Sequence, residues 1–238
     1  FWQMYDNIIP LILKNSFGMG ETITGVIMAM DNVLALFLLP LLGSLSDKVN
    51  TPWGKRTPFI VGGTILAVLF MMMLPVADNA KDLSVFIICL FGTLLAMGLY
   101  RSPAVALMPD LTPNKLRSKA NAIINLMGAV GGLFALAMIT VIIGNKKNPN
   151  YMPLFSAIAI FMIVAVLILI FTINENKIKE KAILEYGEEE MQASKEEDGN
   201  VKAPMAKDVK KSLIFLLLSV ALWYMAYNAV TTAISRYA

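Results

Sequence analysis

Long apolar segments alternate with shorter polar ones along the whole chain. Seven apolar segments are present, covering residues 1–14 and about 21–45, 58–77, 83–108, 118–144, 152–173 and 212–233. A helix that crosses a bilayer needs about 20 mostly apolar residues, and longer helices are accommodated by tilting. None of these segments alternates strictly between polar and apolar positions, so the pattern favours helices over strands. The sequence therefore predicts an all-α membrane protein.

Composition agrees with the pattern. Hydrophobic residues make up 57% of the chain and the mean hydropathy is +0.66, both higher than is usual for a soluble domain. The chain has no histidine and a single cysteine, Cys89, which argues against disulfides and against thiolate or imidazole metal sites. No nucleophile–base pair is visible either. We therefore expect no enzyme activity, no cofactor, no metal and no nucleic-acid partner, and we expect contact with membrane lipid.

The basic residues predict the orientation in the membrane. Fourteen of the 20 lysines and arginines follow the second, fourth and sixth apolar segments. Because such residues concentrate in cytoplasmic loops, those loops and the N-terminus are expected on the cytoplasmic side. This orientation disfavours a heptahelical receptor, whose N-terminus is external. The prediction is a multi-pass protein of the cell membrane, with residues 174–211 in the cytoplasm.

The polar stretch at residues 43–58 reads GSLSDKVNTPWGKRTP. Asp47 lies at the C-terminal end of a predicted helix, where the helix dipole disfavours an acid unless a positive group pairs with it. The stretch resembles the loop between helices 2 and 3 of major facilitator transporters. Its spacing and its Thr-Pro ending resemble sucrose-type transporters and glycoside–pentoside–hexuronide:cation symporters. The resemblance implies a cytoplasmic gate motif made of Gly43, Asp47, Gly54, Lys55 and Arg56.

A second stretch extends the resemblance. Residues 102–111 read SPAVALMPDL, and Arg117 and an Ala-Asn pair follow. This pattern resembles the segment after helix 4 of plant sucrose symporters and adds Asp110 and Arg117 to the gate motif. The arginine of that family falls on Val105 here and its helix-4 acid falls on Leu94. The chain therefore departs from the family at both coupling positions.

The resemblance implies a major facilitator fold with three parts. Residues 1–173 would form the N-terminal transmembrane domain of six helices, the first of them partial. Residues 174–211 would form a cytoplasmic interdomain linker. Residues 212–238 would form the first helix of the C-terminal domain. Because the chain begins inside an apolar segment and ends after the seventh, we expect it to be truncated at both ends, with the C-terminal half as its missing partner.

Away from the ends of the apolar segments there are three charged residues: Asp6, Asp31 and Arg101. Charge at such a depth is costly, so each is a candidate for a functional role. Asp31 and Arg101 are expected to replace the missing coupling residues, with Asp6 in reserve. The alternative is that they form a static buried ion pair.

The function that these observations favour is secondary active transport of a sugar or glycoside with a proton or sodium ion, by alternating access. Candidate contacts with such a substrate are Tyr5, Asn7, Asn125, Tyr227 and Asn228. Two alternatives stay open. One is a facilitator that exports drugs or metabolites, and the other is a channel-like or scaffolding membrane protein that transports nothing.

Overall fold

The computed structural model describes residues 1–49, 51–144 and 149–187 and, with gaps, part of 211–226. The chain divides into two compact units, Phe1–Met191 and Gln192–Ala238. All of the helices discussed below belong to the first unit. In the second unit the described residues are helical.

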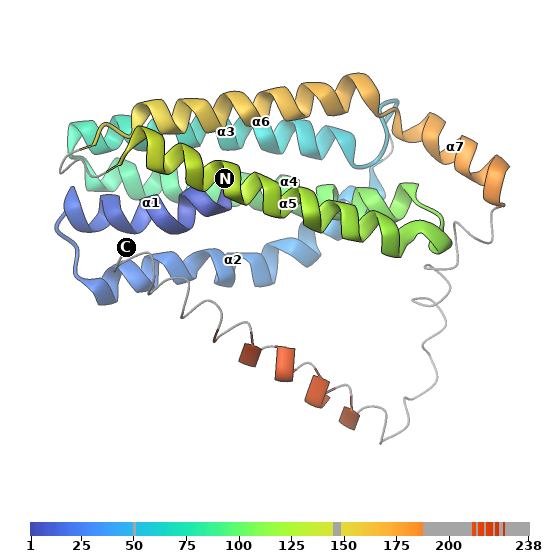
Figure 1. The fold of residues 1–238 in the computed structure, drawn as a ribbon, viewed down its shortest axis with the longest axis horizontal. Helices are drawn as coiled ribbons and strands as arrows, with labels where there is room; N and C mark the ends of the chain where they lie inside the picture. Colours follow the sequence, from blue (N-terminus) through green and yellow to red (C-terminus); the bar gives the residue numbers. More distant parts are fainter. Residues whose placement is uncertain are drawn as a thin grey trace. The chain divides into compact units, whose positions relative to one another are not determined.

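Seven helices make up the described part of the first unit (Figure 1). They are α1 (Trp2–Asn15), α2 (Glu21–Lys48), α3 (Thr57–Ala80), α4 (Leu83–Leu111), α5 (Asn114–Ile142), α6 (Met152–Thr172) and α7 (Glu175–Tyr186). The described residues contain no strand, only an isolated bridge between Thr51 and Gly54. Among the described helices four, α3 to α6, are long and apolar enough to cross a membrane. The predicted all-α membrane fold is thus confirmed.

The helix boundaries follow local chemistry more than apolar pattern. The Asp82 carboxylate caps α4 by accepting hydrogen bonds from the backbone N–H groups of Ser84 and Val85, at 3.0 and 3.1 Å. α5 begins at Asn114, four residues before the apolar segment predicted from residue 118, since the polar residues in between are helical as well. Pro113 occupies its N-cap position, at the start of the helix where proline is tolerated. α7 forms inside the polar segment after α6, where the Asn174 side chain accepts from the N–H of Lys177.

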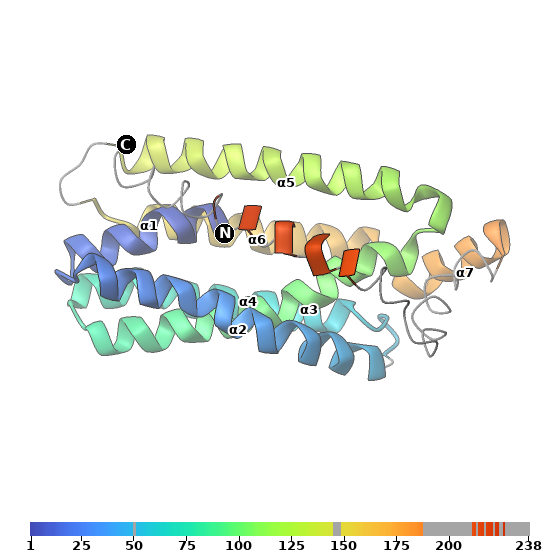
Figure 2. The ribbon, with the colours of Figure 1, turned by 90° about the horizontal axis from the view of Figure 1, so that it is seen from below.

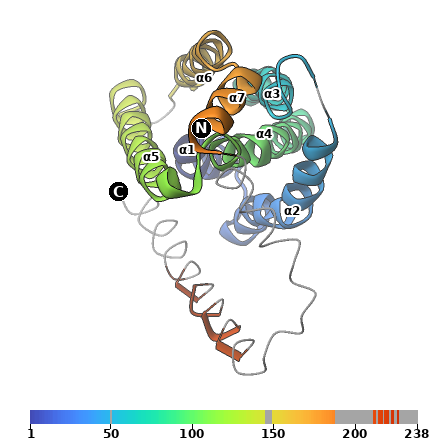
Figure 3. The same ribbon diagram turned by 90° about the vertical axis from the view of Figure 1, so that its right-hand side faces the viewer.

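α1 and α4 lie in the middle of the bundle. Figure 3 views the first unit along the helices and shows α5, α6, α3 and α2 in an arc around these two. The core that they share contains Tyr5 of α1, Phe86 of α4 and Phe155 of α6, all fully buried. Close approach of α3 and α4 depends on Gly63, where an added Cβ would lie 2.8 Å from the Cβ of Tyr100.

α5 is packed much more loosely than its neighbours. The structure describes the whole helix, and Ala135 is its one buried residue. An apolar cavity of about 900 Å³ separates part of α5 from α1 and α6. Figure 2 shows α5 along one side of the bundle, with α6 and α1 beside it.

Candidate functional site

Arg56 is the centre of a charged network at the end of the bundle where α2 and α4 end and α3 begins. We call this the charged end. The Arg56 side chain is only 7% exposed, and its Nη2 and Nε lie 2.6 Å from Asp47 Oδ1 and 2.9 Å from Asp110 Oδ2. Its Nη1 also donates to the Ser46 hydroxyl and to the carbonyl oxygen of Gly43. One guanidinium thus joins the loop before α3 to the ends of both α2 and α4.

The network resolves an electrostatic problem of the helix ends. Asp47 and Asp110 lie in the last turns of α2 and α4, where the helix dipole disfavours negative charge. A buried guanidinium, for its part, needs charged or hydrogen-bonding partners. The carboxylates keep contact with solvent, at 60% and 37% side-chain exposure. Each group therefore offsets the unfavourable position of the other, and Arg56 is the positive partner that Asp47 requires.

Glu175, the first residue of α7, binds the other side of the same loop. Its buried carboxylate accepts hydrogen bonds from the backbone N–H groups of Lys55, at 2.9 Å, and Arg56, at 3.1 Å. It also accepts from the N–H and the hydroxyl of Thr57, at 3.4 and 3.2 Å. No side chain of the loop caps α3, so Glu175 supplies the acceptor and the negative charge that a helix N-terminus favours.

The shape of the loop is adapted to this carboxylate. Gly54 has φ +110°, a conformation that favours glycine, and an added Cβ would lie 2.0 Å from Glu175 Oε2. Next to it, the Asn176 amide donates to the carbonyl oxygen of Pro52 at 3.1 Å. Figures 1 and 2 show α7 at the same end of the bundle as this loop. The N-terminus of α7 is thus docked onto the loop.

The remaining motif residues support the helix ends. Arg117 donates to the carbonyl oxygens of Thr112 and Pro109, at 3.2 and 3.0 Å, and so satisfies acceptors at the end of α4. Gly43 brings α2 close to α4, since a Cβ there would lie 3.0 Å from Ser102 Oγ. Lys55 contributes its backbone N–H. Within the described ranges, neither Lys55 nor Arg117 forms an ion pair.

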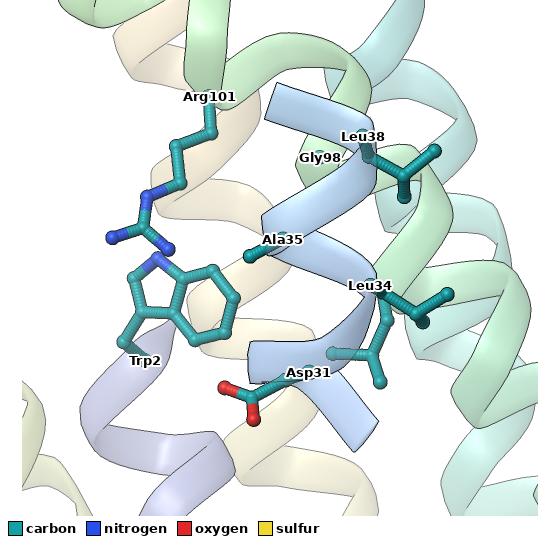
Figure 4. A pocket seen from close by; sticks show the side chains of 8 residues that line it. Trp2, Asp31, Leu34, Ala35, Leu38, Gly98 and Arg101 are labelled. Atoms are coloured by element: carbon teal, nitrogen blue, oxygen red, sulfur yellow. The ribbon is translucent and has the colours of Figure 1, made fainter. Parts of the chain in front are cut away.

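A second polar site lies midway along the bundle. Asp31 of α2, Arg101 of α4 and Trp2 of α1 line a cavity of about 20 Å³, which is room for about one water molecule. Figure 4 shows the Arg101 guanidinium over the Trp2 indole, with the Asp31 carboxylate directed toward the same indole. The guanidinium carbon is 5.0 Å from the ring centroid, a cation–π contact. The three residues thus come together from three helices.

The charges in this cavity are not joined by a direct contact. Asp31 interacts electrostatically with Arg101, yet among the described residues Arg101 forms no ion pair. The Asp31 carboxylate accepts hydrogen bonds from the backbone and side chain of its neighbour Asn32, at 2.6 and 2.9 Å. The cavity therefore keeps donors of Arg101 available for a bound molecule.

The other predicted contact residues are distributed unevenly. Asp6 is exposed and interacts electrostatically with Asp31, whereas its neighbour Tyr5 is fully buried. Asn7 donates to the carbonyl oxygen of Gln3 in its own helix, at 2.7 Å. Asn125 is exposed on α5. Tyr227 and Asn228 lie outside the described residues.

Sequence analysis missed two residues of these sites, Glu175 and Trp2 in its contact with Arg101. Glu175 begins a polar segment rich in charged residues and lies 120 positions after Lys55. The one local indication of its role is its position in the first turn of a helix, directly after an asparagine N-cap. Many solvent-exposed acidic residues occupy such a position, so it does not predict a contact with the loop.

Comparison with known proteins places the whole chain in one family. The family model for the Major Facilitator Superfamily matches residues 1–238. The chain is also 28% identical over 160 residues to the "Probable nitrate transporter NarT" of Staphylococcus haemolyticus (strain JCSC1435), a match covering 66% of this chain and 38% of that protein. The protein of the same name from Staphylococcus aureus (strain bovine RF122 / ET3-1) is 26% identical over 157 residues, 64% of this chain and 38% of its own length. The match thus spans well under half the length of these curated relatives. No solved structure matches the chain.

Proposed function

The chain belongs to the major facilitator superfamily, whose members are transporters, and we propose that it moves a sugar or glycoside together with a proton or sodium ion by alternating access. Its family and its four long apolar helices both indicate a multi-pass membrane protein. The finer proposal, the solute and its coupling to a cation, is supported by the cavity that contains Asp31, Arg101 and Trp2.

The depth of the cavity is the observation that carries the proposal. Asp31 lies ten residues after the start of α2 and 17 before its end, which is about 15 Å and about 25 Å along the axis at about 1.5 Å per residue. Charges at such a depth in a membrane are costly and are found where they bind ions or substrates. A carboxylate accepts hydrogen bonds from hydroxyl groups, a guanidinium donates them, and an indole offers an apolar face. Together these groups offer the contacts that a polyhydroxylated solute needs, and binding one requires the cavity, which holds about one water molecule in this arrangement, to widen in the other arrangement.

The charged end is the proposed cytoplasmic gate. The described loops and helix ends at this end contain basic residues such as Lys55, Arg117 and Lys177, which favours a cytoplasmic location. The contacts of Arg56 and Glu175 hold together three helix ends and α7, and so stabilise one arrangement of the bundle. Alternating access requires two arrangements of nearly equal free energy, so weakening these contacts shifts the balance between them.

The test is uptake by the intact protein in proteoliposomes. A panel of mono- and disaccharides and aryl glycosides is offered with a pH gradient, a sodium gradient or neither. We expect Asp31→Asn to abolish accumulation driven by a gradient while equilibrium exchange of the solute continues. If Asp31→Asn still accumulates the solute and Asp6→Asn does not, coupling belongs to Asp6. Normal accumulation by both variants would leave these carboxylates with a structural role alone.

Anion transport is the second candidate, and Arg101 is the observation that favours it. The relatives are named as nitrate transporters, and a planar guanidinium with available donors is well suited to a planar oxyanion. Nitrate therefore belongs in the same uptake panel. Nitrate uptake that is lost in Arg101→Ala, with no uptake of any sugar, would select this candidate. Efflux of apolar compounds without sugar uptake would instead support the exporter.

A further inference from the structure

Trp2 forms part of the wall of two different cavities. One is the cavity of about 20 Å³ that Asp31 and Arg101 also line, and the other is the apolar cavity of about 900 Å³ beside α5. Among the described residues, Trp2 alone lines both. The indole therefore lies between a small polar space and a large apolar one.

Few contacts hold the indole in this place. The guanidinium carbon of Arg101 is 5.0 Å from its centroid, as Figure 4 shows. The rings of Phe1 and Tyr5 meet it edge to face, with centroids 5.3 and 5.8 Å away. Trp2 is half-buried, and protein interiors seldom contain a void much larger than a water molecule. The larger cavity thus gives this side chain unusual room to move.

The small cavity must widen before it can bind a solute. It has room for about one water molecule, whereas a sugar ring or a nitrate ion is larger than that. Movement of the indole toward α5 would join the two spaces and leave Asp31 and Arg101 at the polar end of the joined space. One side chain can therefore enlarge the site without any change in the positions of α2 and α4.

We propose that Trp2 is a movable wall, which Arg101 holds in place until a solute binds and the indole turns into the larger cavity. The proposal rests on the proposed function and adds a positioning residue to its site. Among the described residues Arg101 forms no ion pair, so the contact with the indole is what restrains its guanidinium. A cation–π contact is weak enough to be exchanged for hydrogen bonds to a solute.

The first test needs no solute. The intact chain has three tryptophans, and Trp53→Phe with Trp223→Phe leaves Trp2 as the only one, so that fluorescence reports on its surroundings. In that protein Arg101→Gln should release the indole. Its emission maximum should then move to shorter wavelength, because the indole enters an apolar space. Gly128→Leu, which fills that space, should abolish the shift.

Gly62→Leu is the matched control for Gly128→Leu. Gly128 lines the larger cavity, and an added Cβ meets nothing within 4 Å. Gly132, one turn later on the same face of α5, would place its Cβ 3.6 Å from Gln3 of α1, so a side chain at position 128 is directed toward α1. Gly62 of α3 has equally open space and lines neither cavity. No shift in Arg101→Gln, or a shift that survives Gly128→Leu, overturns the movable wall.

Uptake distinguishes failure of this inference from failure of the proposed function. The probes are glucose, sucrose and an aryl glycoside. Gly128→Leu should raise the half-saturating concentration of the accumulated sugar about tenfold or more over Gly62→Leu, because the displaced indole meets an occupied space. If the two variants accumulate the sugar with equal half-saturating concentrations, the movable wall is wrong and the proposed function stands. If Gly128→Leu abolishes the emission shift and no gradient drives accumulation of any sugar, the wall stands and the proposed function is wrong.

Discussion

The charged end and the cavity midway along the bundle are both built around an arginine, yet their partners differ. Arg56 pairs with two carboxylates, and the loop beside it is capped by Glu175. Arg101 is exposed, lies on an indole and forms no ion pair with the described residues. The contrast indicates that the charged end stabilises a conformation, while the guanidinium beside the cavity keeps donors for a ligand.

Gly54→Ala is expected to have the largest effect on the charged end. The substitution places a Cβ at positive φ and 2.0 Å from the Glu175 carboxylate, so it strains the loop and displaces the cap together. We expect a loss of about 3 kcal/mol in the free energy of unfolding, measured by denaturation in detergent.

Gly18→Ala is the matched control for Gly54→Ala. Gly18 also has a positive φ, +65°, but an added Cβ there meets nothing within 4 Å. It should cost about 1 kcal/mol, the conformational contribution alone. Equal losses in the two variants would show that Glu175 does not determine the shape of the loop.

Glu175→Ala should come next in magnitude. It leaves the first N–H groups of α3 without an acceptor and removes a negative charge from the helix N-terminus, at about 2 kcal/mol. Hydrogen exchange at Lys55, Arg56 and Thr57 should accelerate. The exposed Glu180 of the same helix provides the control, because Glu180→Ala leaves the cap intact. Unchanged exchange in Glu175→Ala would contradict the docking of α7.

Smaller and graded losses are expected at the two partners of Arg56. Asp110 is the less exposed partner, so Asp110→Asn should destabilise by about 1 kcal/mol and Asp47→Asn by about half of that. Both variants should insert into the membrane normally and transport more slowly. An unaltered transport rate in both variants would show that the Arg56 network has no part in gating.

Neutralising Asp31 in the cavity should have the smallest effect on stability. Unlike the substitutions above, it should not destabilise the protein. Asp31 is paired with no cation directly, so Asp31→Asn should leave the unfolding temperature unchanged or raise it slightly. The same variant should lose coupled uptake. A large drop in stability would mean that Asp31 is a structural residue and that the two regions are alike.

The sequence by itself determined the long apolar helices, because apolar segments of bilayer length have one way to satisfy their backbone groups in a membrane. It also identified the charged residues at depth, Asp6, Asp31 and Arg101, since position along a helix follows from counting residues. The loop motif indicated the family, which the match over the whole chain confirms. These conclusions depend on neighbours in sequence or on a recurring pattern.

Only the tertiary structure decided which groups meet. Asp110 reaches Arg56 across 54 positions and Glu175 reaches the same loop across almost 120. Arg101 lies on Trp2 rather than on a carboxylate. Each of these contacts depends on how the helices rotate and how closely they approach, and that is set by packing at residues such as Gly43 and Gly63. Periodicity places a residue at a height and on a face, but its partner lies on another helix whose orientation the local pattern does not contain.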